Sequence, residues 1–408
     1  MNRIVLIGNG FDLAHGLKTR YEDFINWYWD YRVDGFVIER TDTSSDCLCT
    51  FKHLFGNTWK SFYEFNIRPF YTFQKIDGKE VIQSILKDYE KYKVIYSPFF
   101  ENICKSIKTK GWVDIENEYY RLLTEYTLTD SIVKDWKGLN SQLRYLKDLL
   151  IKYLKFIDEQ DVSIIDSIRS KIYAPIKMDD IAVSAKSILK ENVDSWMEQN
   201  DLLVRDKIRR YGLKEEDFLE IIKYFRDNYK TEKVLFTDIP RQYLLPDAVM
   251  LLNFNYTHTA QLYHEEDLGF INYIHGKIDN PQSVIFGYGD ELDDDYKRLQ
   301  KLNDNEYLAN IKTIKYQESD NYRKLLAFAE SAPYQVCIMG HSCGNSDRTL
   351  LNTLFEHKNC ISIKPYYYIK EDGTDNYLDL IQNISRNFTD MKLMRDRVVN
   401  KIYCETLL

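Results

Sequence analysis

The sequence lacks any long apolar run. Its apolar stretches end well before the roughly 20 residues that a membrane-spanning helix needs. The first of them, at residues 4–7, is short and is soon followed by charge, unlike the core of a secretory signal peptide. We therefore expect a cytoplasmic protein that has no membrane partner.

Regularly spaced cysteines and an excess of positive charge are also missing. The seven cysteines are an odd number without a repeated Cys-x-x-Cys spacing, which argues against a disulfide framework, a zinc ribbon or another metal site. The formal net charge of −8 argues against nucleic acid as a partner. The 32 tyrosines are spread through helical stretches, which is typical of packing residues. A reducing cytoplasm fits this composition.

What the sequence does have is a glycine turn directly after its first apolar run. Residues 4–7 are typical of a central parallel strand, because helices cover both faces of such a strand. Gly8 and Gly10 let the backbone turn tightly, and the helix that follows points its positive dipole end at the same place. This arrangement favours an anionic ligand. A purely structural turn with two glycines is the alternative.

The 408 residues are enough for two or three domains. Further strand-like segments lie at 233–236, 249–252, 271–275, 284–286, 335–339 and 361–369. From about Glu80 to Tyr229, apolar residues recur at helical spacing. We predict a discontinuous α/β nucleotide-binding core at 1–75 and 233–370, a helical insertion at 76–232 and a C-terminal helix at 371–408 packed on the core. The insertion is either a solvated helical block or a lid over the substrate.

Polar residues follow the ends of the later apolar runs. The segments concerned are Asn253-Phe254-Asn255-Tyr256-Thr257, Ile274-His275-Gly276, Gly287-Tyr288-Gly289-Asp290 and Gly340-His341-Ser342. Strand ends of an open α/β sheet meet at its carboxyl edge, where ligands bind. We therefore expect one mainly parallel sheet that brings Gly10 and Asn255 to the same edge.

These motifs, together with Ile7-Gly8-Asn9-Gly10-Phe11-Asp12, resemble those of the AbiH family of bacterial abortive-infection proteins. Over residues 1–45 and 233–370 the chain is similar to the sirtuin-like superfamily. The resemblance implies a sirtuin-like, Rossmann-type parallel sheet with a large helical insertion. It also implies an anti-phage effector that hydrolyses NAD+ to nicotinamide and ADP-ribose.

The resemblance implies two sets of functional residues. His275 is expected to be the catalytic base and Asn255 to fix the ribose. The expected nucleotide contacts are Gly8, Asn9, Gly10, Phe11, Asp12, Tyr256, Gly340, His341 and Ser342. A histidine suits this chemistry because its ordinary pKa lets it accept a proton at cellular pH. A core histidine bonded to a neighbouring carbonyl is the structural alternative for His275.

The chain departs from the sirtuin pattern in three respects. Asp12 brings a carboxylate near the expected pyrophosphate. The two groups repel each other unless the carboxylate bonds ribose hydroxyls, caps the helix or holds a metal. Thr257 stands where many NAD-cleaving relatives have aspartate. The zinc-binding cysteine module of protein deacylases is absent, which argues against protein deacetylation and against zinc.

Two functions of different classes follow. The first is an NAD+ hydrolase that stays inactive until a phage-derived protein triggers it. The second is a non-catalytic module that senses a nucleotide or a phage protein in the same pocket. An enzyme needs Asn255 and His275 to face one ribose, whereas a binding module needs only the pocket. A homo-oligomer is compatible with both, and a degenerate fold kept for assembly is a third alternative.

Overall fold

The structure is a computed structural model that describes residues 1–408 except 55–58, 73–74, 129–134, 199–200, 215 and 230–243. The chain divides into two compact units. Unit 1 comprises Met1–Leu17, Asp161–Ile285 and Thr313–Leu408, and unit 2 comprises Lys18–Gln160 and Phe286–Lys312. These limits differ from the domain limits expected after residues 75, 232 and 370, which stay a prediction.

Unit 1 contains the predicted parallel sheet. Its strands are β1 (Asn2–Ile7), β7 (Val249–Asn253), β8 (Gly269–Tyr273), β9 (Tyr334–Met339) and β10 (Cys360–Tyr366). They form a five-stranded sheet in the order β10-β9-β1-β7-β8, and every pair is parallel. The predicted α/β class is therefore confirmed. β1 lies at the centre, so the turn that follows it has a strand end on either side.

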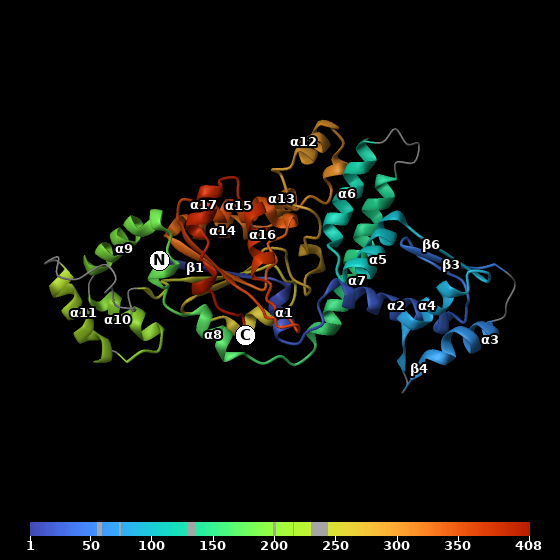
Figure 1. Ribbon diagram of the computed structural model, residues 1–408, viewed down its shortest axis with the longest axis horizontal. Coiled ribbons are helices and arrows are strands. Elements are labelled where there is room, and N and C mark those ends of the chain that lie inside the picture. Colours follow the sequence, from blue (N-terminus) through green and yellow to red (C-terminus); the bar gives the residue numbers. More distant parts are fainter. Residues whose placement is uncertain (55–58, 73–74, 129–134, 199–200, 215, 230–243) are drawn as a thin grey trace. The chain divides into compact units, whose positions relative to one another are not determined.

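Helices cover both faces of this sheet. They are α1 (Asn9–Ala14), α8 (Asp166–Ile172), α14 (Asn321–Ser331), α15 (Arg348–Phe355), α16 (Tyr377–Arg386) and α17 (Met391–Arg397). Ile4 and Leu6 of β1 pack on the face of α14 to α17, and Val5 and Ile7 pack on the face of α1 and α8. Figure 1 shows α14, α15 and α17 on one side of the strands and α8 on the other. Burial on both faces explains the continuous apolar run.

The remaining helices of unit 1 gather around a separate apolar cluster. They are α9 (Lys186–Glu198), α10 (Asp201–Arg210) and α11 (Glu216–Tyr229). Leu189, Ile208 and Phe225 from these helices join Met1 and Ile361 in that cluster. At the other end of the sequence, the segment expected to be one closing helix forms two, α16 and α17. Both pack against β10 and the adjoining core.

Unit 2 combines helices with a small antiparallel sheet. Its helices are α2 (Tyr21–Glu39), α3 (Trp59–Phe62), α4 (Gly78–Lys87), α5 (Pro98–Lys110), α6 (Ile115–Leu128), α7 (Trp136–Asp158) and α12 (Asp294–Lys301). The short helix α13 (Lys312–Lys315) begins at Lys312, the last residue of unit 2. A three-stranded sheet orders β2 (Ser44–Ser45), β3 (Cys49–His53) and β6 (Tyr92–Tyr96), and β4 (Tyr71–Thr72) pairs with β5 (Lys75–Ile76). Sequence patterns did not indicate these strands.

Two further strand predictions had other outcomes. The segment at 233–236 lies outside the described residues. The strand expected at 284–286 is wrong, because this segment leaves the short 3-10 turn Pro281–Ser283 and forms no strand. Its apolar residues are buried as loop contacts: Ile285 N–H donates to the carbonyl of His275 at 2.9 Å. Burial without a neighbouring strand thus produced a strand-like pattern.

Candidate functional site at the carboxyl edge of the sheet

Four turns of unit 1 meet at the carboxyl edge of the parallel sheet. They follow β1, β7, β8 and β9, and they carry the residues that the sequence predicted for the site. Phe254 N–H donates to the carbonyl of Ile7 at 2.9 Å, and Ile274 N–H donates to that of Asn253 at 3.1 Å. The strand ends are therefore joined side by side, as expected for one edge.

The glycines after β1 allow two turns to pack backbone against backbone. Gly10 N–H donates to the carbonyl of Gly340 at 2.8 Å, and Gly8 N–H donates to that of Met339 at 3.3 Å. A side chain at Gly8 would come within 2.5 Å of the Cα atom of His341. Gly340 has a φ of +77°, and a side chain there would come within 2.1 Å of the Phe11 nitrogen. The close approach that requires glycine is therefore an approach between two turns of the protein itself.

This joint between the two turns leads to a prediction for stability. Gly340→Ala should lower the free energy of unfolding by more than about 2 kcal/mol, because alanine resists the left-handed conformation and its methyl group clashes with Phe11. Gly35→Ala is the control, because a methyl group there meets no described atom within 4 Å. Replacing a mid-helix glycine should raise stability by about 0.5–1 kcal/mol. Urea unfolding measures both. Equal effects of the two variants would contradict this view of the turn.

Asn255 ties the turn after β7 to the turn after β1. Its Nδ2 donates to the carbonyl of Gly8 at 3.0 Å, and its main-chain N–H donates to Oδ1 of Asn253 at 3.0 Å. The side chain is half-buried. The structure therefore brings Asn255 and the glycine turn together, as predicted, and gives the asparagine a positioning task in addition to any contact with a ligand.

Asp12 and Thr257 form one contact. Thr257 Oγ1 donates to Asp12 Oδ2 at 2.6 Å, and both residues are about 1% exposed. The two residues that depart from the sirtuin pattern are thus partners across the same two turns. The Asp12 carboxylate lies in the interior, away from the exposed surface of the turn at Asn9. The hydroxyl that Asp12 contacts thus belongs to a side chain of the protein, a contact that was not predicted from the sequence.

His275 and His341 lie on either side of a buried carboxylate. His275 Nε2 is 3.2 Å from Oδ1 of Asp347, and His341 Nε2 is 3.6 Å from Oδ2. His275 Nε2 is also 3.2 Å from the hydroxyl of Tyr316. The ring of Phe254 packs against both histidines, with centroid distances of 5.2 and 4.1 Å. His275 is held by side chains rather than by a carbonyl alone.

The hydrogen bonds indicate where the two imidazoles carry their protons. His341 Nδ1 accepts from Cys343 N–H at 3.0 Å, so the proton of the neutral ring is on Nε2 and faces Asp347. The carboxylate likewise favours a proton on Nε2 of His275, which leaves Nδ1 as the nitrogen that accepts one. Asp347 thus fixes the tautomers of two rings. Both histidines are nearly buried, at 4% and 6% exposure.

Sequence reasoning missed Asp347. It precedes α15 as the helix N-cap residue, and an aspartate there usually accepts hydrogen bonds from the first turn of the helix. The side chain of Asp347 makes no such capping bond and instead faces His275 and His341. The available signal was an acidic residue in the polar turn after β9, but a capping role explained it equally well.

Other predicted residues lie around this cluster with separate partners. Tyr256 donates its hydroxyl hydrogen to the carbonyl of Ile285 at 2.9 Å. Ser342 is exposed, and its carbonyl accepts from Asn383 Nδ2 at 2.9 Å. Phe11 is fully buried against the ring of Tyr263. Of the predicted nucleotide contacts, Asn9 and Ser342 are the exposed ones.

Electrostatics at this edge argue against a thiolate nucleophile. Burial raises the pKa of the Cys343 thiol, and the charge of Asp347 raises it further. The thiol is therefore neutral at cellular pH and unreactive.

Among the described residues, no group of three His, Cys, Asp or Glu side chains is arranged to hold a metal ion. His258 is exposed to solvent in part and pairs with Asp279 at 2.6 Å.

The comparison with known families decides the identity of the chain. The family model for bacteriophage abortive infection AbiH matches residues 4–368. The chain belongs to this AbiH family. The match covers nearly the whole chain and so includes all the strand-end turns described above. The likeness to sirtuins is not part of this match and stays a prediction.

Membership places the chain among the proteins of bacteriophage abortive infection. No curated protein and no solved structure is significantly similar to it. Among the described helices, none has the length and apolar character required to cross a bilayer.

Proposed function

We propose that this AbiH-family chain acts in abortive infection as a sirtuin-like hydrolase of NAD+, which it cleaves to nicotinamide and ADP-ribose. The observation that carries the proposal is the cluster of His275, Asp347 and His341. This cluster lies at the sheet edge that also holds Asn255 and the glycine turn. A histidine oriented by a buried carboxylate is a common general base.

In the proposed reaction, water adds to the anomeric carbon of the nicotinamide ribose. The bond from that carbon to the pyridinium nitrogen breaks, and its electron pair leaves with nicotinamide. His275 Nδ1 accepts the proton of the water and later releases it to solvent. Asp347 stabilises the imidazolium that forms, because its carboxylate lies 3.2 Å from Nε2. The centre resembles an oxocarbenium ion, so fixing the ribose lowers the barrier.

The remaining predicted residues act as binding groups in this proposal. Asn255 holds Gly8 through Nδ2 and uses its Oδ1 for a ribose hydroxyl. The exposed turn residues Asn9 and Ser342 contact the rest of the dinucleotide. The buried position of Asp12 supports the fit, since its Oδ2 accepts a hydrogen bond from Thr257 and the residue is only about 1% exposed.

One observation favours a second function, the non-catalytic sensing module. His275 is only 4% exposed, and its Nε2 already has two side-chain partners. A binding module tolerates such burial, whereas an enzyme must let a reactant reach the ring. The two functions differ in turnover: the module binds a nucleotide and returns it unchanged.

A nucleotide panel separates the two functions. The purified chain is incubated with NAD+, NADP+, ATP and GTP, with and without lysate of phage-infected bacteria, and the products are separated by chromatography. The proposal expects nicotinamide and ADP-ribose from NAD+, and none from a His275→Ala control in the same lysate. Calorimetric binding of NAD+ without product would establish the sensing module instead. Absence of both binding and product would refute both functions.

A further inference from the structure

The terminal strand of the antiparallel sheet in unit 2 has an open edge. Among the described residues, β6 pairs only with β3. Leu54 N–H donates to the carbonyl of Lys91 at 2.8 Å, and Ser97 N–H donates to that of Leu48 at 2.8 Å. Because bonding alternates along an antiparallel pair, Lys93 and Ile95 direct their main-chain groups to β3. Val94 and Tyr96 therefore direct theirs away from it.

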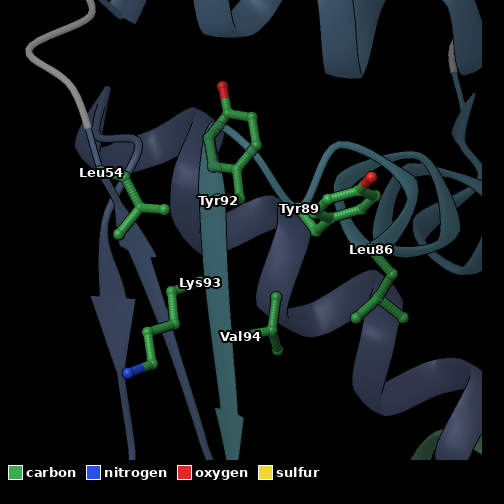
Figure 2. Close-up of a pocket in the computed structure, with 6 residues that line it drawn as sticks. All are labelled: Leu54, Leu86, Tyr89, Tyr92, Lys93 and Val94. Atoms are coloured by element: carbon green, nitrogen blue, oxygen red, sulfur yellow. The ribbon is translucent and has the colours of Figure 1, made fainter.

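A hollow of about 340 Å³ lies beside this strand. Its walls are Leu54, Leu86, Tyr89, Tyr92, Lys93 and Val94. Figure 2 shows Leu86, Tyr89 and Val94 on one side of β6, and Leu54 and Lys93 on the other. Leu54, Leu86 and Tyr89 are 46%, 42% and 75% exposed. Exposed apolar groups beside main-chain donors and acceptors that pair with no described strand are typical of a peptide-binding strand edge.

The charge on the outer face of this sheet is positive. Lys52 on β3 and Lys93 on β6 are exposed and lie directly opposite each other. Like charges in that position destabilise a sheet. Neither lysine has an ion-pair partner within 4 Å among the described residues, whereas the nearby Lys91 pairs with Asp88 at 2.8 Å. An anionic partner would relieve the repulsion between Lys52 and Lys93, in a chain whose net charge is −8.

We propose that β6 is a docking strand for an extended acidic segment of a partner polypeptide. The segment adds as a fourth strand and bonds to the main chain of Val94 and Tyr96. Its apolar side chains enter the hollow beside Leu86 and Tyr89, and its carboxylates lie against Lys52 and Lys93. Lysine on an edge strand discourages pairing with neutral or basic strands, so the edge selects acidic ones. This surface is independent of the hydrolase proposed above.

A labelled peptide tests the docking strand. The probe is a fluorescein-labelled decapeptide of alternating valine and glutamate, and its binding to the full chain is followed by fluorescence anisotropy. Binding should weaken as ionic strength rises. The double variant Lys52→Glu/Lys93→Glu should lower the affinity about tenfold or more. The control Lys105→Glu/Lys108→Glu changes two exposed lysines of α5 and should leave it unchanged.

A second variant tests the main-chain bonds. Val94→Pro removes an N–H that points away from β3, so the pairing of β3 with β6 is kept. It should abolish peptide binding while circular dichroism stays unchanged. Equal binding of a valine–lysine decapeptide, or displacement of the probe by single-stranded DNA, would overturn the proposal. The proposal would also be overturned if neither variant changed the affinity for the valine–glutamate probe. None of these readouts involves NAD+, so failure here leaves the hydrolase proposal standing.

Discussion

Replacing His275 by alanine is expected to lower the rate of NAD+ hydrolysis by about 100-fold or more, the usual loss when a general base is removed. Nε2 of this ring faces Asp347 and Tyr316, so in the proposed reaction Nδ1 is the nitrogen that accepts the proton of water. His341 also faces Asp347, but its Nδ1 already accepts a hydrogen bond from Cys343 N–H at 3.0 Å. Release of nicotinamide at saturating NAD+ measures the effect, and the KM should change less than the kcat.

A matched control exists in the same unit. His258 forms a histidine–aspartate pair with Asp279, but this pair is far more exposed. His258→Ala should therefore keep the activity of the unchanged chain. His275→Gln keeps a polar side chain opposite Asp347, so it controls for loss of activity by misfolding. This variant should be as inactive as the alanine variant. Turnover of either His275 variant at the original rate would remove the histidine from the mechanism.

Replacing Asp347 by asparagine should lower the kcat by an amount on the order of 100-fold, with little change in KM. Asparagine has the same size, but it cannot stabilise an imidazolium on His275, and its amide group can present a donor where the ring needs an acceptor. Asp347 is thus a positioning residue that acts through His275. If Asp347 had only a structural role, the variant would have a lower free energy of unfolding but no selective loss of kcat over KM.

Asp279→Asn is the corresponding control for the carboxylate. It changes the exposed His258 pair in the same way and should have no effect on turnover. Thermal unfolding of both asparagine variants shows whether the folded state persists. If Asp347→Asn keeps full activity, or if its loss is accounted for by unfolded protein, the carboxylate has no part in orienting the base.

The parallel sheet was predictable because its strands carry an unmistakable pattern. β1, β7 and β9 are short apolar runs that end in glycine or polar residues, and burial on both faces requires such runs. β3 and β6 were missed because each has one exposed face, so that residues such as Lys52 and Lys93 interrupt the apolar pattern. The run at 284–286 was wrongly predicted as a strand, because a buried loop can have the same apolar composition as a short strand.

The site was predictable in its location and only partly in its contacts. Residues after strand ends were expected to meet, and Asn255 does contact Gly8. The pairing of Asp12 with Thr257 joins positions 245 residues apart, and nothing local in the sequence indicates such a contact. Asp347 had an ordinary explanation as a helix cap. Contacts of this kind depend on how the turns fold back on each other, which local sequence patterns do not reveal.

The most direct test of the hydrolase is to run the reaction in water enriched in oxygen-18. The full chain, with lysate of phage-infected bacteria where a trigger is required, is incubated with NAD+, and the products are analysed by mass spectrometry. The account predicts ADP-ribose that carries one heavy oxygen at the anomeric carbon and unlabelled nicotinamide, and neither product above background from the His275→Ala chain. Intact NAD+, or an ADP-ribose product without the heavy oxygen, would contradict it.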